Sequence, residues 1–494
     1  MTTTGRGKVL DWRFSFFGRT SSASKVPVVD GKLSTDGVDP QRLALCLEVL
    51  AEVEALPVEH PDAVAVRQAT AGLFKTVKLR RRRERRDAIL EADRAVTAAT
   101  ATGAPGRIDD ETAGLPLRTP TAAPTAGFLL QSRGCYVCKK RYQQVDAFYH
   151  QLCPECAALN HSRRDARTDL TGRRALLTGG RAKIGMYIAL RLLRDGAHTT
   201  ITTRFPNDAV RRFAAMPDSG DWLHRLRVVG IDLRDPAQVV ALADSVAARG
   251  PLDILINNAA QTVRRSAGAY SAISAAESEP LPDGPLPELE FLGGRSAAGE
   301  LTGGPTVSAH AVTALALTAG STMIDAGGLM PDTAPTNSWS DRVHEVLPLE
   351  LLEVQLCNVT APFVLVSRLR AAMTASSFPR RYVVNVSAME GVFSRGYKGS
   401  GHPHTNMAKA ALNMLTRTSA ADMFADGILM TSVDTGWITD ERPHPTKMRL
   451  HEEGFHAPLD LVDGAARVYD PIVRGEQGED VYGCFLKDYG PIAW

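Results

Sequence analysis

The residues with the most specific chemistry in this sequence are four cysteines arranged as two C-x-x-C pairs. Cys135 pairs with Cys138, Cys153 pairs with Cys156, and fourteen residues separate the two pairs. Each pair presents two thiolates on one turn, and four thiolates complete the tetrahedral coordination of Zn²⁺ without an open position. The spacing therefore predicts a structural zinc site in a zinc-ribbon-like module, with an iron–sulfur cluster as the alternative.

A glycine-rich turn between residues 174 and 185 carries the second informative pattern. An apolar run ends at Leu177, Thr178 and two glycines follow, and a helical pattern of apolar residues begins at Ile184. A strand, a glycine turn and a helix open a doubly wound nucleotide-binding sheet, in which phosphates rest on the helix N-terminus. The turn therefore indicates phosphate binding, although many tight turns use glycine only for its backbone freedom.

Strand patterns recur after this turn, over His198–Thr203, Leu226–Ile231 and Leu252–Ile256. A helical pattern over about 236–248 lies between the last two, and such alternation predicts an α/β fold with a parallel sheet. Arg204 follows the second strand, where an acid would suit the ribose 2′-OH of NAD and a cation suits the 2′-phosphate of NADP. With Arg181 inside the glycine turn, Arg204 favours NADP over NAD; the alternative is a plain loop cation.

At Asn257-Asn258-Ala259-Ala260 the chain clearly resembles the short-chain dehydrogenase/reductase family, and the resemblance covers roughly residues 169–262 and 337–494. It implies a doubly wound Rossmann sheet and an oxidoreductase with a nicotinamide cofactor. The predicted cofactor-binding residues are Thr178, Gly179, Arg181, Lys183, Ile184, Gly185, Arg204, Asp232, Leu233, Asn258, Ala259, Lys409, Gly436 and Thr439.

The same resemblance assigns catalytic roles. Asn358 matches the helix asparagine that supports the family's proton relay, and Ser387, at the end of a strand pattern, matches the catalytic serine. Lys409 matches the lysine that holds the ribose. These matches imply that the serine polarises a substrate oxygen while hydride passes between the nicotinamide and a carbon atom.

Two positions depart from the family's pattern. Lys183 stands at the middle glycine of the T-G-x-x-x-G-x-G motif, where its side chain could pair with phosphate. Thr405 stands four residues before Lys409, at the place of the tyrosine that acts as general acid. A phenol has a pKa near about 10 that can be lowered toward neutrality, whereas an aliphatic hydroxyl cannot be moved that far. Thr405 could therefore orient a carbonyl but not readily protonate it.

Three side chains in the loop before Thr405 could replace the tyrosine as proton donor, namely Tyr397, His402 and His404. The pKa of histidine suits proton transfer, and the alternative for each histidine is an exposed loop residue. The predicted catalytic set is Ser387, Lys409, Asn358, Thr405 and His404.

The composition is that of a globular protein. Of 494 residues, 44% are hydrophobic and 23% are charged, and a net charge of +2 is too small to imply overall affinity for nucleic acid or membranes. The N-terminus lacks the unbroken apolar stretch of a secretory signal, and the most apolar helical candidate, Ala309–Met323, is too short to span a bilayer. Clustered cysteines indicate a reduced compartment. We therefore expect a cytoplasmic protein without a membrane span.

Changes of pattern divide the chain into five predicted parts. They are an unassigned segment (1–38), a helical hairpin (39–97), a flexible linker rich in Ala, Thr, Pro and Gly (98–127), the cysteine module (128–165) and the Rossmann domain (166–494). An insertion at about 262–336 leaves the Rossmann domain near the expected substrate position. This insertion could be a lid or a subdomain that shapes the substrate site. Alternatively, it could be a packing or disordered insertion.

A basic run, Arg80–Arg86, lies inside the second predicted helix. It could bind a protein or another anionic partner, but acidic residues at helical spacing favour a solvated helix face.

The leading hypothesis is an NADP-dependent oxidoreductase for a small-molecule carbonyl or alcohol. A catalytically silent NADP-binding scaffold, which recruits a partner through the cysteine module and basic helix, is the alternative. A lyase, epimerase or isomerase on the same frame is a third, and the resemblance also implies a homo-oligomer.

Overall fold

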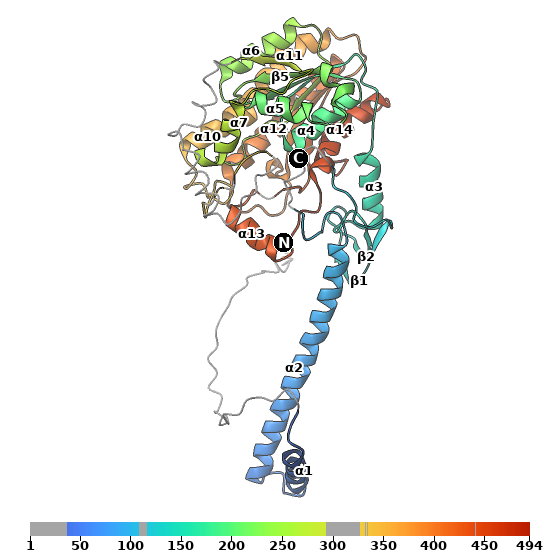
Figure 1. Ribbon diagram of the computed structural model, residues 1–494, viewed down its shortest axis with the longest axis vertical. Coiled ribbons are helices and arrows are strands. Elements are labelled where there is room, and N and C mark those ends of the chain that lie inside the picture. Colours follow the sequence, from blue (N-terminus) through green and yellow to red (C-terminus); the bar gives the residue numbers. More distant parts are fainter. Residues whose placement is uncertain (1–36, 108–115, 293–326, 331, 333, 440) are drawn as a thin grey trace, which may run out of the picture. The chain divides into compact units, whose positions relative to one another are not determined.

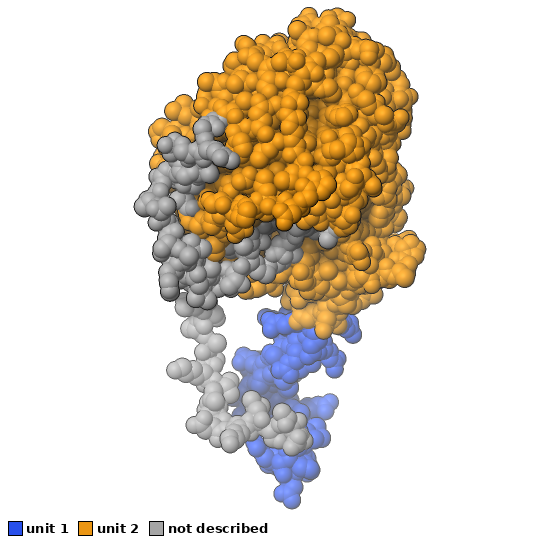
Figure 2. All heavy atoms as spheres, turned by 45° about the horizontal axis from the view of Figure 1, so that its top comes forward, with its two compact units in different colours: residues 1–85 blue, residues 86–494 orange. Residues whose placement is uncertain are grey.

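The computed structural model of the chain describes residues 37–107, 116–292 and 327–494, apart from residues 331, 333 and 440 (Figure 1). Contacts within the chain divide it into two compact units, residues 1–85 and 86–494 (Figure 2). Residues 1–36 of the unassigned segment and the predicted helix Ala309–Met323 lie outside the described residues.

Two helices lie in the segment 39–97, for which the sequence predicts a helical hairpin. Helix α1 spans Pro40–Glu54 and α2 spans Pro61–Ala98. The Asp39 side chain caps α1 by accepting a hydrogen bond from the backbone N–H of Arg42 at 3.0 Å. All residues of the basic run Arg80–Arg86 are exposed in α2, as expected for a solvated helix face, and an anionic partner for this run stays a prediction.

The flexible linker predicted for residues 98–127 is wrong for its N-terminal part. Thr102 is fully buried, and the guanidinium of Arg107 donates hydrogen bonds to the carbonyl oxygens of Ala457 and Leu459 at 2.8 and 2.6 Å. Alanine and threonine are small enough to pack closely, so a composition typical of linkers here forms a buried connection. The partners of Arg107 lie far away in the sequence, so the local composition could not indicate that this segment is buried.

The cysteine module consists of an antiparallel pair of strands and one helix. Strand β1 spans Thr125–Gly134, β2 spans Arg141–Asp146, and α3 spans Pro154–Arg164. The first cysteine pair lies in the turn between the strands, and the second pair lies at the start of α3. The module's buried side chains belong to the apolar core of the larger unit: Leu129, Tyr142, Val145, Phe148, Tyr149 and Leu152.

A nine-stranded sheet forms the centre of the larger unit, in the order β11-β10-β9-β8-β6-β3-β4-β5-β7. Its neighbouring strands are parallel, except that β10 and β11 are antiparallel. The strands are β3 (Arg174–Leu177), β4 (His198–Thr203), β5 (Leu226–Gly230), β6 (Ile254–Asn257), β7 (Glu288–Phe291), β8 (Arg381–Ser387), β9 (Ile428–Asp434), β10 (Phe485–Lys487) and β11 (Gly490–Ile492). This is the predicted doubly wound α/β arrangement.

Helices cover both faces of this sheet (Figure 1). The first face carries α4 (Lys183–Arg194), α5 (Pro206–Ala214) and α14 (Leu461–Glu476), and the second carries α6 (Pro236–Ala248), α11 (Ala361–Thr374) and α12 (Pro403–Ala425). Two separate apolar cores result, one under each helical layer. The remaining helices are α7 (Ser271–Glu277), α10 (Pro348–Gln355) and α13 (His444–Glu452). Short helical turns are η1 (Ser219–Asp221), η2 (Leu223–Arg225), η3 (Ala267–Tyr270), η4 (Leu356–Thr360) and η5 (Met389–Gly391).

The segment predicted as an insertion, 262–336, contributes a strand to the sheet. Strand β7 pairs in parallel with β5 at the sheet edge, through residues 227–230 and 288–291. The insertion therefore extends the Rossmann sheet as well as contributing residues near its carboxyl edge.

One helical run, Pro348–Thr374, is long and apolar enough by length and composition to cross a membrane, with a mean hydropathy of 1.5. It comprises α10, a π-helical turn and α11. Leu365, Leu369 and Met373 are fully buried in the core that α11 shares with α6. This packing accounts for the apolar composition, as in the core helix of a globular domain.

Candidate dinucleotide site and catalytic residues

The glycine turn after β3 is fixed by the turn after the neighbouring strand β6. The hydroxyl oxygen of Thr178 accepts hydrogen bonds from the backbone N–H groups of Asn258 and Ala259, both at 3.0 Å. The side-chain amide of Asn258 donates in return to the carbonyl oxygens of Thr178 and Gly179, at 3.0 and 3.1 Å. The two predicted motifs therefore form one rigid unit at the carboxyl edge of the sheet.

The glycines of this turn lie where the chain leaves no space for a side chain. A Cβ atom on Gly180 would lie 2.5 Å from Cγ2 of Ile201, and one on Gly179, whose φ is 71°, would lie 2.9 Å from Cα of Ala259. A Cβ atom on Gly185 would overlap the carbonyl oxygen of Gly179. Close packing brings the N-terminus of α4 to the end of β3, which is the geometry that binds a pyrophosphate.

Lys183, which replaces the family's middle glycine, keeps the backbone conformation of a glycine. Its φ is 53°, in the left-handed region that residues with a Cβ rarely adopt. The backbone here therefore has a conformation that glycine adopts without strain, and a lysine side chain extends from it.

A cavity of about 410 Å³ opens at this edge of the sheet. Eleven predicted cofactor-binding residues line it: Gly179, Arg181, Lys183, Ile184, Gly185, Arg204, Asp232, Leu233, Asn258, Ala259 and Thr439. Thr178 supports the cavity from behind through its hydrogen bonds, and Lys409 and Gly436 are not part of the lining.

Residues of the 262–336 segment complete the cavity, and the sequence did not indicate them. Tyr270 accepts a hydrogen bond from the guanidinium of Arg204 at 3.3 Å, and its ring centroid lies 5.1 Å from the guanidinium carbon. Arg181 forms an ion pair with Asp208 at 2.5 Å and donates to the carbonyl oxygen of Gly327 at 2.6 Å. Aromatic stacking orients Arg204, and the ion pair orients Arg181.

Asp232 lies at the end of β5, where the resemblance implies contact with adenine. Its carboxylate lies 2.7 Å from the guanidinium of Arg234. Burial would raise the pKa of this carboxyl, but hydrogen bonds from Arg234 outweigh burial and lower it. Asp232 is therefore ionised and paired, so it adds no unpaired negative charge to the phosphate end of the cavity.

The predicted catalytic serine, threonine and lysine are buried between β8 and α12. Ser387 is the last residue of β8, and Thr405 and Lys409 lie one turn apart on α12. The hydroxyls of Ser387 and Thr405 have no hydrogen-bond partner among the described residues, although both side chains are buried. The ammonium of Lys409 donates to the carbonyl oxygen of Val386 at 2.8 Å, and burial lowers its pKa to about 8.

Asn358 lies in the π-helical turn Leu356–Thr360, between α10 and α11. Its side-chain oxygen accepts from the N–H of Gln261 at 2.7 Å, and its amide donates to the Gln261 carbonyl at 2.9 Å. This reciprocal pair joins the helix to the chain just after the Asn-Asn-Ala motif. A π-helical turn is frequent at functional sites, because it re-aims one side chain inside a helix.

The three predicted substitutes for the tyrosine differ in their surroundings. The Tyr397 side chain is 79% exposed, and the His402 ring stacks on Trp339 with a centroid distance of 4.1 Å. His404 is 2% exposed, and neither ring nitrogen has a hydrogen-bond partner among the described residues. Burial lowers the pKa of His404 below the usual histidine value, so its imidazole is neutral near pH 7.

The buried carboxyl of Asp434, which no sequence pattern indicated, lies near the predicted catalytic serine. In the parallel pairing of β8 and β9, Ser387 lies opposite Asp434. The carboxylate accepts a hydrogen bond from the N–H of Met389 at 3.2 Å and lies 3.3 Å from the ammonium of Lys487. Burial raises its pKa. Its position as the last residue of a central strand was the available signal.

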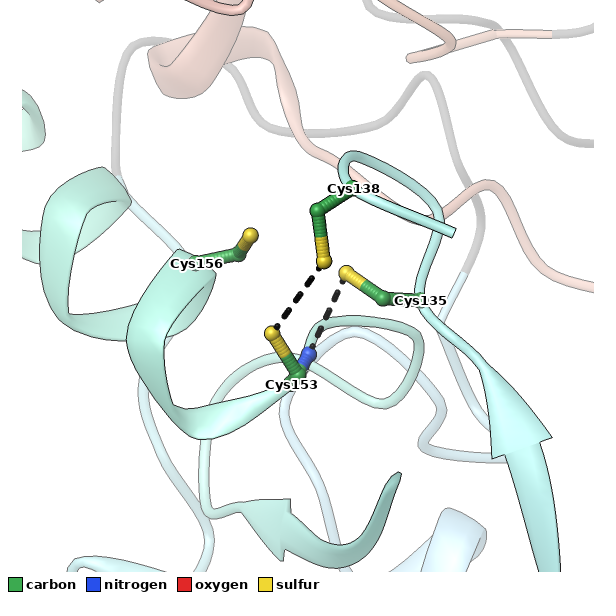
Figure 3. Close-up of side chains that lie close together, drawn as sticks. All are labelled: Cys135, Cys138, Cys153 and Cys156. Atoms are coloured by element: carbon green, nitrogen blue, oxygen red, sulfur yellow. Dashed lines mark hydrogen bonds between the residues drawn. The ribbon is translucent and has the colours of Figure 1, made fainter. Parts of the chain in front are cut away.

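The four cysteines converge on one point (Figure 3). Their Sγ atoms all lie within 4.8 Å of one another, and the sulfurs of Cys138 and Cys153 are 3.6 Å apart. A disulfide needs about 2.05 Å, whereas the edge of a tetrahedron with Zn–S bonds of about 2.3 Å is about 3.8 Å. The backbone N–H of Cys153 also donates to Sγ of Cys135 at 3.3 Å. The geometry fits four thiolates around one ion.

Comparison with known proteins agrees with this architecture. Residues 173–278 match the short chain dehydrogenase family model. Protein R665 of Acanthamoeba polyphaga mimivirus, which is uncharacterized, is 31% identical over 353 residues, covering 69% of this chain and 71% of its own. A probable oxidoreductase of Streptomyces antibioticus is 44% identical over 94 residues, which are 18% of this chain and 30% of that protein.

Among solved structures, the NADPH-bound carbonyl reductase from chicken fatty liver aligns at 18% identity with a TM-score of 0.42, over 67% of this chain and 98% of that chain. The family assignment rests on the sequence matches. The matched segment contains the glycine turn and the Asn-Asn-Ala motif, which form one rigid unit, and the mimivirus relative extends the similarity over most of the chain. Residues 173–278 of the chain belong to the short-chain dehydrogenase family.

Proposed function

We propose that this protein is an NADP-dependent oxidoreductase that acts on the carbonyl or alcohol group of a small molecule. One observation carries the proposal: a close-packed glycine turn and the buried Ser387 and Lys409 lie at the carboxyl edge of the same parallel sheet. In such sheets ligands bind at that edge. The Streptomyces relative, named a probable oxidoreductase, supports the same reaction class.

The residues present fit a dinucleotide. The turn between Gly179 and Gly185 would hold the pyrophosphate on the N-terminus of α4, where Lys183 adds a positive charge. Arg204, held against Tyr270, would bind the 2′-phosphate that distinguishes NADP from NAD. The bound cofactor would supply or accept the hydride.

The chain's own residues would act on the substrate oxygen. The hydroxyl of Ser387 is buried without a partner, so it is available to donate a hydrogen bond that polarises a carbonyl. Lys409, with a pKa of about 8, is protonated at neutral pH and could supply a proton. The hydroxyl of Thr405, which makes no hydrogen bond to another described residue, would orient the carbonyl. Neutral His404 is the competing donor, and it would act only at acidic pH.

Absorbance of NADPH, followed with a panel of carbonyl compounds, tests the proposal. Ser387→Ala should lower kcat by a factor of about 100 or more, because one donor to the developing oxyanion is lost. Ser394→Ala is the matched control, because Ser394 is exposed in a nearby loop. If both variants lose activity equally, the role assigned to Ser387 is contradicted. The role is also contradicted if the wild type is active and Ser387→Ala keeps its full activity.

One observation favours a second candidate, a catalytically silent NADP-binding scaffold. Thr405 replaces the general acid, and its hydroxyl is fully enclosed. A scaffold should bind NADPH tightly, show no turnover across the carbonyl panel, and retain its cellular role in Lys409→Ala. Turnover that depends on Ser387 rejects this candidate.

We also propose that the four cysteine thiolates hold one structural zinc ion, since four sulfur ligands leave no open position for catalysis. Elemental analysis of the purified full chain should give one zinc per chain. Cys153→Ser should lose it, and Cys46→Ser, which changes an exposed cysteine in α1, should keep it. Metal content well below one per chain in the wild type contradicts the site, and iron in place of zinc indicates a cluster.

A further inference from the structure

The cysteine module is joined to the dinucleotide cavity through helix α14. Arg164, in the last turn of α3, donates two hydrogen bonds to the carboxylate of Asp460, at 2.6 and 2.8 Å. Its guanidinium also lies 3.0 Å from the carboxylate of Asp463. These two aspartates form the capping box at the N-terminus of α14, so one buried arginine of the module holds the start of that helix.

The start of α14 is itself part of the cavity. Leu461, its first residue, lines the cavity. Gly464 packs so closely that a Cβ atom there would overlap Ile438 and would lie 3.3 Å from Cδ1 of Ile184 in the glycine turn. Helix α14, whose start contacts Arg164, therefore packs against the segments of Ile184 and Ile438, both of which would surround the dinucleotide.

A second connection begins inside the first cysteine pair. Tyr136 lies between Cys135 and Cys138, and its hydroxyl oxygen accepts a hydrogen bond from the backbone N–H of Trp437 at 2.9 Å. Trp437 belongs to the segment that leads to Thr439 at the cavity.

We propose that the cysteine module is a metal-dependent clamp on the dinucleotide site. Zinc on the four thiolates fixes the turn that carries Tyr136 relative to α3, which carries Arg164, and these two residues fix Trp437 and the start of α14. The inference rests on the proposed zinc and dinucleotide binding. The metal would link the β1–β2 turn to the start of α3, so metal loss loosens this link, frees both contacts and weakens NADPH binding.

Two measurements on the full chain test the clamp, before and after zinc removal with a chelator under reducing conditions. Hydrogen exchange should increase in peptides covering residues 436–463, and the Kd for NADPH should rise about fivefold or more, the factor for one lost hydrogen bond. Unchanged exchange in these peptides after zinc loss overturns the clamp. Unchanged Kd with increased exchange overturns its role in cofactor binding.

A matched pair of variants separates the clamp from general damage to the module. Tyr136→Phe removes the acceptor for Trp437, whereas Tyr142→Phe removes a hydroxyl that donates to the carbonyl oxygen of His150 within the module. We expect Tyr136→Phe to keep zinc and bind NADPH about fivefold more weakly, and Tyr142→Phe to bind it normally. Equal weakening in both contradicts the clamp. If the wild type binds no NADPH, the proposed function is contradicted. The effect of zinc removal on hydrogen exchange in residues 436–463 then remains as the test of the clamp.

Discussion

Replacing Lys183 by glycine separates two ways in which the divergent turn could bind a pyrophosphate. The backbone of Lys183 has a φ of 53°, which costs a residue with a Cβ about 1 kcal/mol. Glycine removes this strain but loses about 0.5–1 kcal/mol in conformational entropy on folding. The two effects nearly cancel, so Lys183→Gly should change the free energy of unfolding by less than about 1 kcal/mol.

The effect on binding should be larger. If the ammonium of Lys183 pairs with phosphate, its loss removes a charged hydrogen bond worth about 1.5–3 kcal/mol. Because Lys183 is only half-buried, we expect the lower value, a rise in the Kd for NADPH of about tenfold. Fluorescence titration measures this Kd, and Lys183→Met, which keeps the strain and the apolar stem, should show the same loss. Tighter binding by Lys183→Gly would contradict this role and would show that the lysine obstructs the turn.

Three further predictions concern the same site. Gly185→Ala should abolish NADPH binding in a titration, because its Cβ would overlap the carbonyl oxygen of Gly179; retained binding would contradict the role of this turn. Arg204→Ala should weaken NADPH binding about tenfold and leave NADH binding nearly unchanged, and an equal loss for both cofactors would remove Arg204 from the 2′-phosphate site. The rate of carbonyl reduction should be full well below pH 8 and fall to about half at pH 8, where half of Lys409 has lost its proton. If the rate instead falls as pH rises through a value below the usual histidine pKa, His404 is the donor.

Local patterns were sufficient for the central sheet. The strand predicted at His198–Thr203 has those bounds, and the glycine turn and the Asn-Asn-Ala motif meet as the resemblance implies. Apolar runs bounded by glycine or charged residues carry this information in the sequence itself. Strand β7 was not predicted, because four residues of mixed polarity at a sheet edge give a weak pattern.

Features that depend on distant partners could not be predicted. The burial of Arg107 depends on carbonyl groups about 350 positions away, and the orientation of Arg204 depends on Tyr270 in a segment without a recognisable motif. The lowered pKa of Lys409 is likewise a consequence of its burial between α12 and β8. Residue types were enough to name the candidate site residues. Their orientation and pKa values depend on tertiary packing, which local sequence does not indicate.

Titration of the full-length protein with NADPH and NADH, by calorimetry at fixed salt concentration, tests the central claim most directly. The account predicts one binding site per chain for NADPH, with a Kd about tenfold or more below that for NADH, because Arg204 meets the 2′-phosphate. Gly185→Ala should bind neither. Absence of binding of either dinucleotide by the wild type would contradict the account.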